Sequence, residues 1–120
     1  MDHVSLVVFE AGQHRFALEA SRVRRLSSTP SHTRTAHLAR LLNLEGSAPA
    51  SRWLTLVDGE GAWELGVAGS TKLIDWPAPA LYPLSELVLV RASVHPALIG
   101  IAFERQHTPC WLLAADRLTP

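Results

Sequence analysis

The chain has 120 residues, enough for one ordinary domain that removes about two thirds of its unfolded surface from water. Eleven basic residues balance eleven acidic ones, so no overall charge attracts nucleic acid or an anionic membrane, and we expect neither as a partner. The single cysteine, Cys110, excludes a disulfide within these residues, and no apolar run approaches the roughly 18 residues of a membrane span. We therefore expect a cytoplasmic location without membrane insertion.

The first 26 residues predict a hairpin followed by a change of period. Apolar side chains lie on both faces of residues 4–9, and glycine in the turn at residues 11–13 lets the chain reverse into a second strand. After that strand, Ala20, Val23 and Leu26 recur three residues apart. This spacing predicts either a short helical turn or an extended strand with a bulge.

A loop and a short helix come next. Residues 27–35 are rich in serine, threonine and proline without apolar periodicity, which predicts a loop. Leucines in residues 36–44 match helical spacing, and Gly46 is placed to end that helix in a left-handed conformation.

The clearest hairpin signal is the run Asp-Gly-Glu-Gly at residues 58–61. It separates two strand-like segments, residues 53–57 and 62–67, and Asp-Gly favours a turn with positive φ. The expected elements in the rest of the chain are a strand at 73–76, an exit from the sheet at the prolines of 77–79, a loop from 82 to 85, a short apolar run at 87–90, and a closing pair of strands at 97–103 and 110–114.

Several short motifs occur in a recognisable order. Residues 22–26 read Arg-Val-Arg-Arg-Leu, Gly66 lies inside the second strand of the central hairpin, and residues 77–83 carry prolines. A glycine-containing strand follows at 98–102, and the chain closes with an Asp-x-Leu-like end in residues 111–118. In this order and spacing, the chain resembles the CheW-like adaptor domain of bacterial chemosensory arrays along nearly its whole length.

The resemblance implies a mostly β fold with one or two short helices. The family has two small five-stranded β-barrels, so residues 1–120 would form a single CheW-like domain. Its first subdomain would span approximately residues 1–50, closed by a strand from the C-terminal part, and its second approximately residues 51–115.

One departure from the family concerns the first barrel. Residues 27–35 lead almost directly to the leucine-rich helix, so an Asn-Leu-Arg-Gly-like motif and about two strands of roughly five residues each are absent. We expect the first barrel to be incomplete, with exposed strand edges that need cover. Four alternatives would cover them: the loop at 27–35, an inward shift of the helix, a second copy of the chain as a homodimer, or a partner protein.

The resemblance also implies a non-catalytic adaptor. Its partners would be the cytoplasmic tip of a chemoreceptor, a methyl-accepting chemotaxis protein, and a CheA-type histidine kinase. Because Arg25 replaces the family's usual Glu and the Asn-Leu-Arg-Gly-like motif is missing, we expect receptor binding to be kept and kinase coupling to be lost or altered. The expected protein-binding residues are Arg22, Val23, Arg25, Leu26, Val67 and Trp76.

Three residues carry more specific expectations. Val23 resembles a groove contact of the family, but its spacing also fits a core residue of the first barrel. Trp76 precedes a proline, so we expect it to be exposed at the surface. Ser70 stands where the family usually has Asp, which makes it a substitute helix cap.

The sequence gives little support for a metal site or a catalytic site. His107 and Cys110 are three residues apart, but a closed metal site needs four converging ligands and the other histidines are scattered, so we expect no metal and no cofactor. Asp58 and Glu60 share a hairpin tip that offers no enclosed pocket, so we expect no enzyme. The alternative function is a small β-barrel ligand-binding protein or enzyme with a cleft lined by Trp and His.

Overall fold

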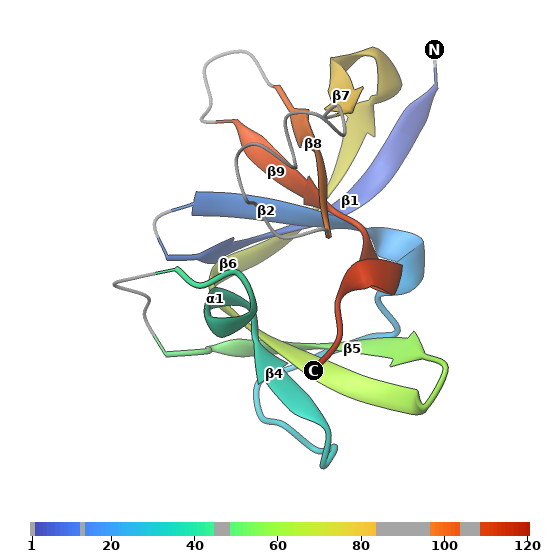
Figure 1. Cartoon of the computed structure of the whole chain (residues 1–120). Coiled ribbons are helices and arrows are strands. Elements are labelled where there is room, and N and C mark those ends of the chain that lie inside the picture. Colours follow the sequence, from blue (N-terminus) through green and yellow to red (C-terminus); the bar gives the residue numbers. More distant parts are fainter. Residues whose placement is uncertain (1, 13, 45–48, 84–96, 104–108) are drawn as a thin grey trace.

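A computed structural model shows a mostly β protein in which one long strand belongs to two sheets (Figure 1). It describes residues 2–12, 14–44, 49–83, 97–103 and 109–120. In chain order the elements are β1 (His3–Ala11), β2 (His14–Glu19), the 3-10 turn η1 (Ala20–Arg22), β3 (Arg25–Ser27), β4 (Thr35–His37), α1 (Leu38–Leu41), β5 (Arg52–Asp58), β6 (Gly61–Pro77), the 3-10 turn η2 (Ala78–Ala80), β7 (Leu81–Pro83), β8 (Leu98–Ala102), β9 (Cys110–Leu113) and the 3-10 turn η3 (Ala115–Arg117).

The strand that joins the two sheets is β6. Its first part, residues 61–67, pairs antiparallel with β5, and its second part, residues 68–77, pairs antiparallel with β1. Val8 pairs with Lys72 but Glu10 pairs with Ala68, so β6 carries a bulge between the two parts. Gly69 lies in this bulge with a φ of 70°, a left-handed conformation that a glycine adopts without strain.

Two expectations for this region are wrong. The strand expected at residues 73–76 is the second part of β6 and not a separate element, because the bulge at Gly69 redirects the strand without ending it. Ser70 is therefore inside a strand and caps no helix.

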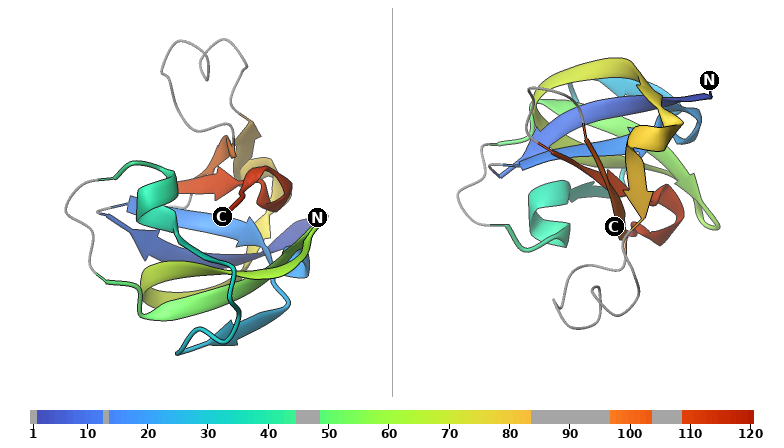
Figure 2. Two further views of the ribbon diagram at one scale, coloured as in Figure 1. Left: turned by 60° about the horizontal axis from the view of Figure 1, so that its bottom comes forward. Right: turned by 90° about the horizontal axis from the view of Figure 1, so that it is seen from above.

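Two groups of strands result. The β1 sheet runs in the order β7-β8-β9-β2-β1 and ends on the second part of β6. The β5 sheet contains β3, β5, the first part of β6 and β4, which pairs with β6 in parallel. In the left view of Figure 2, β1 and β2 (blue) lie over β5 and β6 (green). The described strands form an open path, so two closed five-stranded barrels and a subdomain boundary near residue 50 stay predictions.

The larger core fills the space between the two sheets. Phe9, Phe16 and Leu18 from the first hairpin meet Leu54 and Trp63 from the central hairpin, and all five are at most 4% exposed. A smaller core lies on the opposite face of the β1 sheet, and its buried members are Leu6, Val8, Ala17, Trp76, Ala102 and Cys110. The predicted burial of residues 4–9 on both sides is thereby confirmed, since alternate side chains enter different cores.

The central and closing hairpins form as expected. β5 and β6 pair through a register that places Asp58 opposite Gly61, and β8 pairs antiparallel with β9. Other expectations need correction: the helix is only the single turn of α1, preceded by the strand β4, and Asn43 takes the left-handed conformation (φ 55°). β7 replaces the start of the loop expected at residues 82–85. Gly46, the run at 87–90 and His107 lie outside the described residues.

Residues 28–34 cover the outer face of the β5 sheet. β3 pairs with one edge of β5 and β4 pairs with the far edge of β6, so the connection between them has to cross both strands. It crosses over Glu64, whose side chain points away from the larger core because its neighbours Trp63 and Leu65 point into it. This loop covers a face of the sheet, and how the exposed strand edges are covered stays a prediction.

The Glu64 carboxylate holds this loop. It is fully buried, and its Oε1 accepts hydrogen bonds from the backbone N–H groups of Ser31 (2.5 Å) and His32 (2.6 Å). The His32 Nδ1 lies 3.1 Å from the same oxygen, and the Ser27 hydroxyl donates to Oε2 (3.3 Å). Burial by itself would raise the pKa of Glu64, but these hydrogen bonds outweigh burial and hold the pKa below its usual value.

A second contact fixes the end of the loop. The guanidinium group of Arg34 donates two hydrogen bonds to the Asp58 carboxylate, with N–O distances of 3.0 and 2.7 Å, and lies 3.3 Å from Glu60. The hydrogen bond from Arg34 is the main cause that holds the pKa of Asp58 below its usual value. Both carboxylates of the hairpin tip therefore have a structural partner.

The bulge in β6 generates the first prediction. Gly69→Ala forces a residue with a Cβ into a left-handed conformation, and that Cβ would also meet the Glu10 side chain. We expect a loss of about 1–2 kcal/mol in the free energy of unfolding, measured by urea denaturation. Gly59→Ala is the control, because a Cβ there meets nothing within 4 Å. Equal losses in both variants would contradict the role of the bulge.

The buried carboxylate generates the second prediction. Glu64→Gln removes the charge that the loop amides surround, and we expect unfolding to become easier by about 1–3 kcal/mol at neutral pH. Because the folded pKa is lowered, this contribution is complete above the ordinary value of 4.5 and is lost as the pH falls through the folded pKa. The variant should therefore lose stability less steeply than the wild type on acidification.

The matched control is Glu60→Gln, which makes the same substitution at a side chain that is 82% exposed. We expect it to alter the free energy of unfolding by less than about 0.5 kcal/mol. Indistinguishable acid titrations of the wild type and Glu64→Gln would show that the carboxylate does not hold the loop.

Candidate protein-binding site

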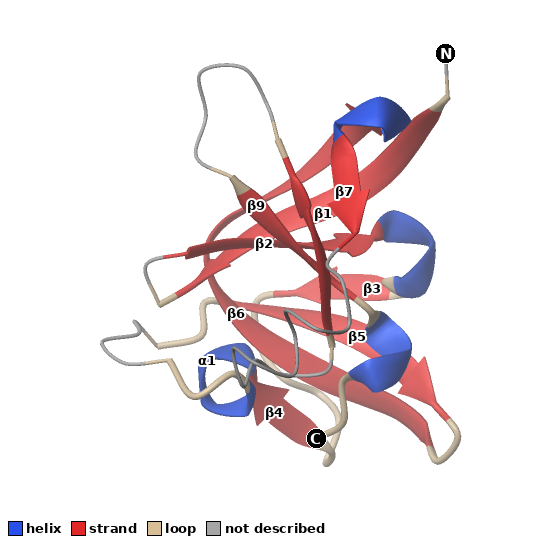
Figure 3. Cartoon of the chain, turned by 45° about the horizontal axis from the view of Figure 1, so that its top comes forward, coloured by secondary structure: helices blue, strands red, loops and turns tan. Residues whose placement is uncertain are grey.

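The chain passes from the β1 sheet to the β5 sheet through residues 20–27, which we call the link (Figure 3). The turn η1 is closed by a hydrogen bond from the Val23 N–H to the Ala20 carbonyl (3.1 Å). The Arg24 N–H then donates to the Thr55 carbonyl (2.8 Å), and β3 begins at the next residue. Of the two conformations expected here, both occur in succession: a helical turn and then a short strand.

The link presents basic and apolar side chains to solvent. Arg22, Arg24 and Arg25 are exposed, and Leu26 is 46% exposed because β3 stands at the end of the strand order. Among the described residues, no acidic side chain forms an ion pair with any of these three arginines. Val23 is half-buried and packs against the larger core, so it joins the exposed part of the link to the interior.

An apolar hollow of about 310 Å³ lies beside the link, and we call it the η1 hollow. Leu6, Ala17 and Leu112, which belong to the smaller core or pack against it, contribute to its lining. The remaining lining residues come from β1, the end of β2, η1, β7, β8, the end of β9 and the segment after it: Val4, Glu19, Arg22, Leu81, Ile99, Leu113, Ala114, Ala115 and Asp116. An apolar lining with a few charged side chains suits the docking of a protein segment.

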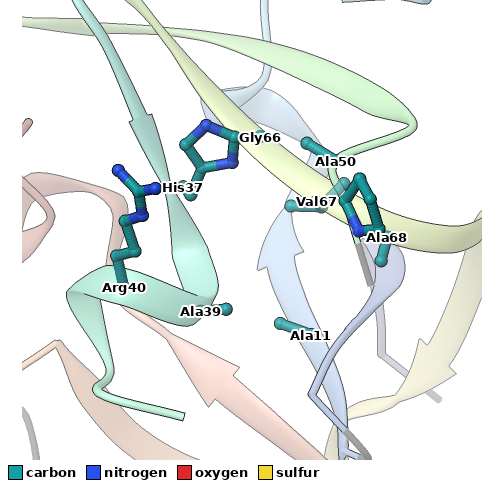
Figure 4. Close-up of a pocket in the computed structure, with 9 residues that line it drawn as sticks. Ala11, His37, Ala39, Arg40, Ala50, Gly66, Val67 and Ala68 are labelled. Atoms are coloured by element: carbon teal, nitrogen blue, oxygen red, sulfur yellow. The ribbon is translucent and has the colours of Figure 1, made fainter. Parts of the chain in front are cut away.

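A second hollow, of about 320 Å³, lies between α1 and the middle of β6 (Figure 4). Its lining is mostly alanine and glycine, and His37 and Arg40 are its polar members. Gly66 is required here, because a Cβ would lie 2.9 Å from both the Ala50 Cβ and the Trp53 ring. The ring of His37 packs edge to face against Trp53, with centroids 5.2 Å apart, and no tryptophan lines this α1 hollow.

The two hollows therefore give little support to the alternative function, a ligand-binding protein or enzyme with a cleft lined by Trp and His. No tryptophan among the described residues lines either hollow, and the Trp53 side chain is only 8% exposed. No group of three or more His, Cys, Asp and Glu residues that could hold a metal ion occurs in the same part of the chain. Burial raises the pKa of Cys110 to about 11, against a smaller opposite effect of Arg15, which disfavours the reactive thiolate.

The six residues expected to bind protein separate into two groups. Arg22, Val23, Arg25 and Leu26 lie together on the link. Val67 and Trp76 are each 1% exposed, in the larger and the smaller core respectively. The expected surface exposure of Trp76 is wrong, because its position along β6 turns the ring towards the smaller core, where Nε1 donates to the Phe103 carbonyl (3.1 Å).

The sequence did not reveal several residues that line the η1 hollow. Ile99 and Asp116 lie far along the chain from the link and come beside it only because β9 pairs with β2 in parallel. No local pattern marks such residues, since each belongs to an ordinary strand or turn.

Comparison with known proteins bears on the fold. No family model matches the sequence, and no curated protein matches it. The crystal structure of the scaffolding protein TtCheW from Thermoanaerobacter tengcongensis is similar to this structure with a TM-score of 0.76, over 96% of this chain and 91% of that chain. The fold is CheW-like. At 12% sequence identity this likeness concerns the path of the backbone, and it confirms the predicted CheW-like fold.

Within the described part of the chain, no helix is long and apolar enough to span a membrane.

Proposed function

We propose that this chain is a non-catalytic adaptor of a bacterial chemosensory system, which works in the cytoplasm and binds the helical tip of a chemoreceptor. The observation that carries the proposal is the gathering of Arg22, Val23, Arg25 and Leu26 on one exposed link, directly beside an apolar hollow. The CheW-like fold supports it, since a scaffolding protein shares this backbone arrangement.

The exposed apolar side chains of this region fit a docking role. Leu26 is 46% exposed and Ile99 is 37% exposed, so each can lose apolar surface to a partner. Interfaces depend on a few anchors of this kind, surrounded by polar contacts that exclude water. In the described residues the carboxyl groups with a lowered pKa are Asp58 and Glu64, and both are occupied by structural hydrogen bonds, which supports a role without acid or base catalysis.

We further propose that coupling to a CheA-type kinase is lost or altered. The first subdomain is short in comparison with the family that the sequence resembles, and a loop covers the outer face of the β5 sheet where residues 28–34 cross it. Arg25 also reverses the charge that the family usually has at this position. Strong binding to the regulatory domain of a CheA-type kinase would contradict this part of the proposal.

Receptor binding can be tested with variants of the two anchors. We expect Leu26→Glu and Ile99→Glu each to weaken binding to purified chemoreceptor tip fragments of the source organism by about 30-fold, because a charge would replace a buried apolar contact. Biolayer interferometry with the immobilised tip measures the dissociation constant.

The control is Leu73→Glu, since Leu73 is 70% exposed on β6 and lines neither hollow. It should bind like the wild type. Failure of the wild type to bind any of the tips, or an equal loss in the control, would refute receptor docking at the link.

A further inference from the structure

The link concentrates positive charge in a protein that has no net charge. Arg22, Arg24 and Arg25 fall within four residues, and all three side chains are exposed. Among the described residues no acidic group forms an ion pair with them: Glu19 and Asp116 line the η1 hollow beside Arg22 without an ion pair, and Asp58 and Glu60 are both paired with Arg34. The basic charge of the link is therefore available to an external partner.

The backbone beside these arginines is also available. β3 pairs with β5 through one edge only, and in the described part of the chain no strand follows it in the sheet. Arg25 pairs with Thr55, and Val57 lies two residues further along β5 on the same face, with 54% of its surface exposed. Leu26 adds a second exposed apolar side chain. Unpaired backbone groups, apolar side chains and positive charge thus occur together.

We propose that this basic edge, made of Arg22, Arg24, Arg25 and Leu26, binds an acidic segment of the partner protein. Carboxylates of the partner lie against the guanidinium groups, and an apolar side chain of the partner lies against Leu26. The inference rests on the proposed function, since it names the charge of the surface that the adaptor recognises. It follows from the positive charge of Arg22, Arg24 and Arg25, which an acidic segment complements across the interface.

Two other occupants fit less well. A second copy of the chain would bring a matching set of arginines to the same edge, and like charges there oppose pairing. Nucleic acid binding depends on a longer basic surface that follows the phosphates, whereas this edge has Leu26 among three arginines on a neutral protein. A protein segment with both carboxylates and an apolar side chain matches all the groups that the edge presents.

The test compares the wild type with the double variant Arg24→Glu/Arg25→Glu, which leaves Arg22 and the η1 hollow unchanged. The control is Arg40→Glu/Arg52→Glu, which changes the net charge equally at two exposed side chains outside the link. With the immobilised receptor tip as probe, we expect the first variant to bind at least about tenfold more weakly, chiefly through slower association, and the control to bind like the wild type. Raising the salt concentration should weaken the wild type and leave the first variant nearly unaffected. Thermal melting verifies that both variants fold.

A charge swap makes the test specific. Tip variants in which single Asp or Glu residues are changed to Lys should recover binding to Arg24→Glu/Arg25→Glu. If the tip binds the wild type and this variant equally at low salt, the inference is wrong while the proposed function stands.

If no tip binds the wild type, the proposed function fails, and two synthetic peptides of equal apolar pattern, one rich in Glu and one rich in Lys, test the inference separately. Binding of the Glu peptide alone, lost in the double variant, supports an acidic partner. The inference is overturned if neither peptide binds. It is also overturned if a fluorescent oligonucleotide binds and the Glu peptide does not.

Discussion

The structure depends on the requirement that β6 serve two sheets at once. Its first part pairs with β5 and its second part with β1, so the direction of one strand sets how the two sheets face each other. The bulge at Gly69 makes the change of partner possible, because a left-handed residue lets the strand turn without ending. The larger core is built in the space that this arrangement encloses, with side chains from both hairpins. The link makes the second covalent connection between the sheets, and the candidate site lies there.

Cover for the outer face of the β5 sheet comes from a loop and a buried charge. An ionised carboxylate without partners would be strongly disfavoured in this position, so Glu64 is acceptable only because the loop supplies backbone N–H groups, a hydroxyl and an imidazole. The dependence is mutual, since the backbone N–H groups of Ser31 and His32 have this carboxylate as their acceptor. Arg34 then holds the end of the loop to the hairpin tip. Seven residues, 28–34, thus cover the outer face of the β5 sheet.

Much of the fold could be predicted because its signals are local. Alternation along residues 4–9 assigned side chains to two faces, and Asp58-Gly59 located the central turn. Other features could not be predicted, because they depend on distant residues. The leucines after Leu38 keep helical spacing, yet only one helical turn forms, since Leu42 and Leu44 contact the larger core from the irregular segment that follows α1. Trp76 is buried through its place in the long strand, which its neighbouring proline did not indicate. Within the candidate site, the contiguous residues of the link could be found, whereas Ile99 and Asp116 come from the other end of the chain.

The account's central claim is that the chain acts by presenting the link and the η1 hollow to another protein. Backbone chemical shifts of the labelled chain, recorded by NMR during titration with the chemoreceptor tip, test this claim most directly, because every backbone amide reports its own environment. The account predicts that the largest shifts fall on residues 20–27 and on Ile99 and Leu112, with small changes around the α1 hollow. Shifts confined to the α1 hollow, or no shifts at a saturating concentration of the tip, would contradict it.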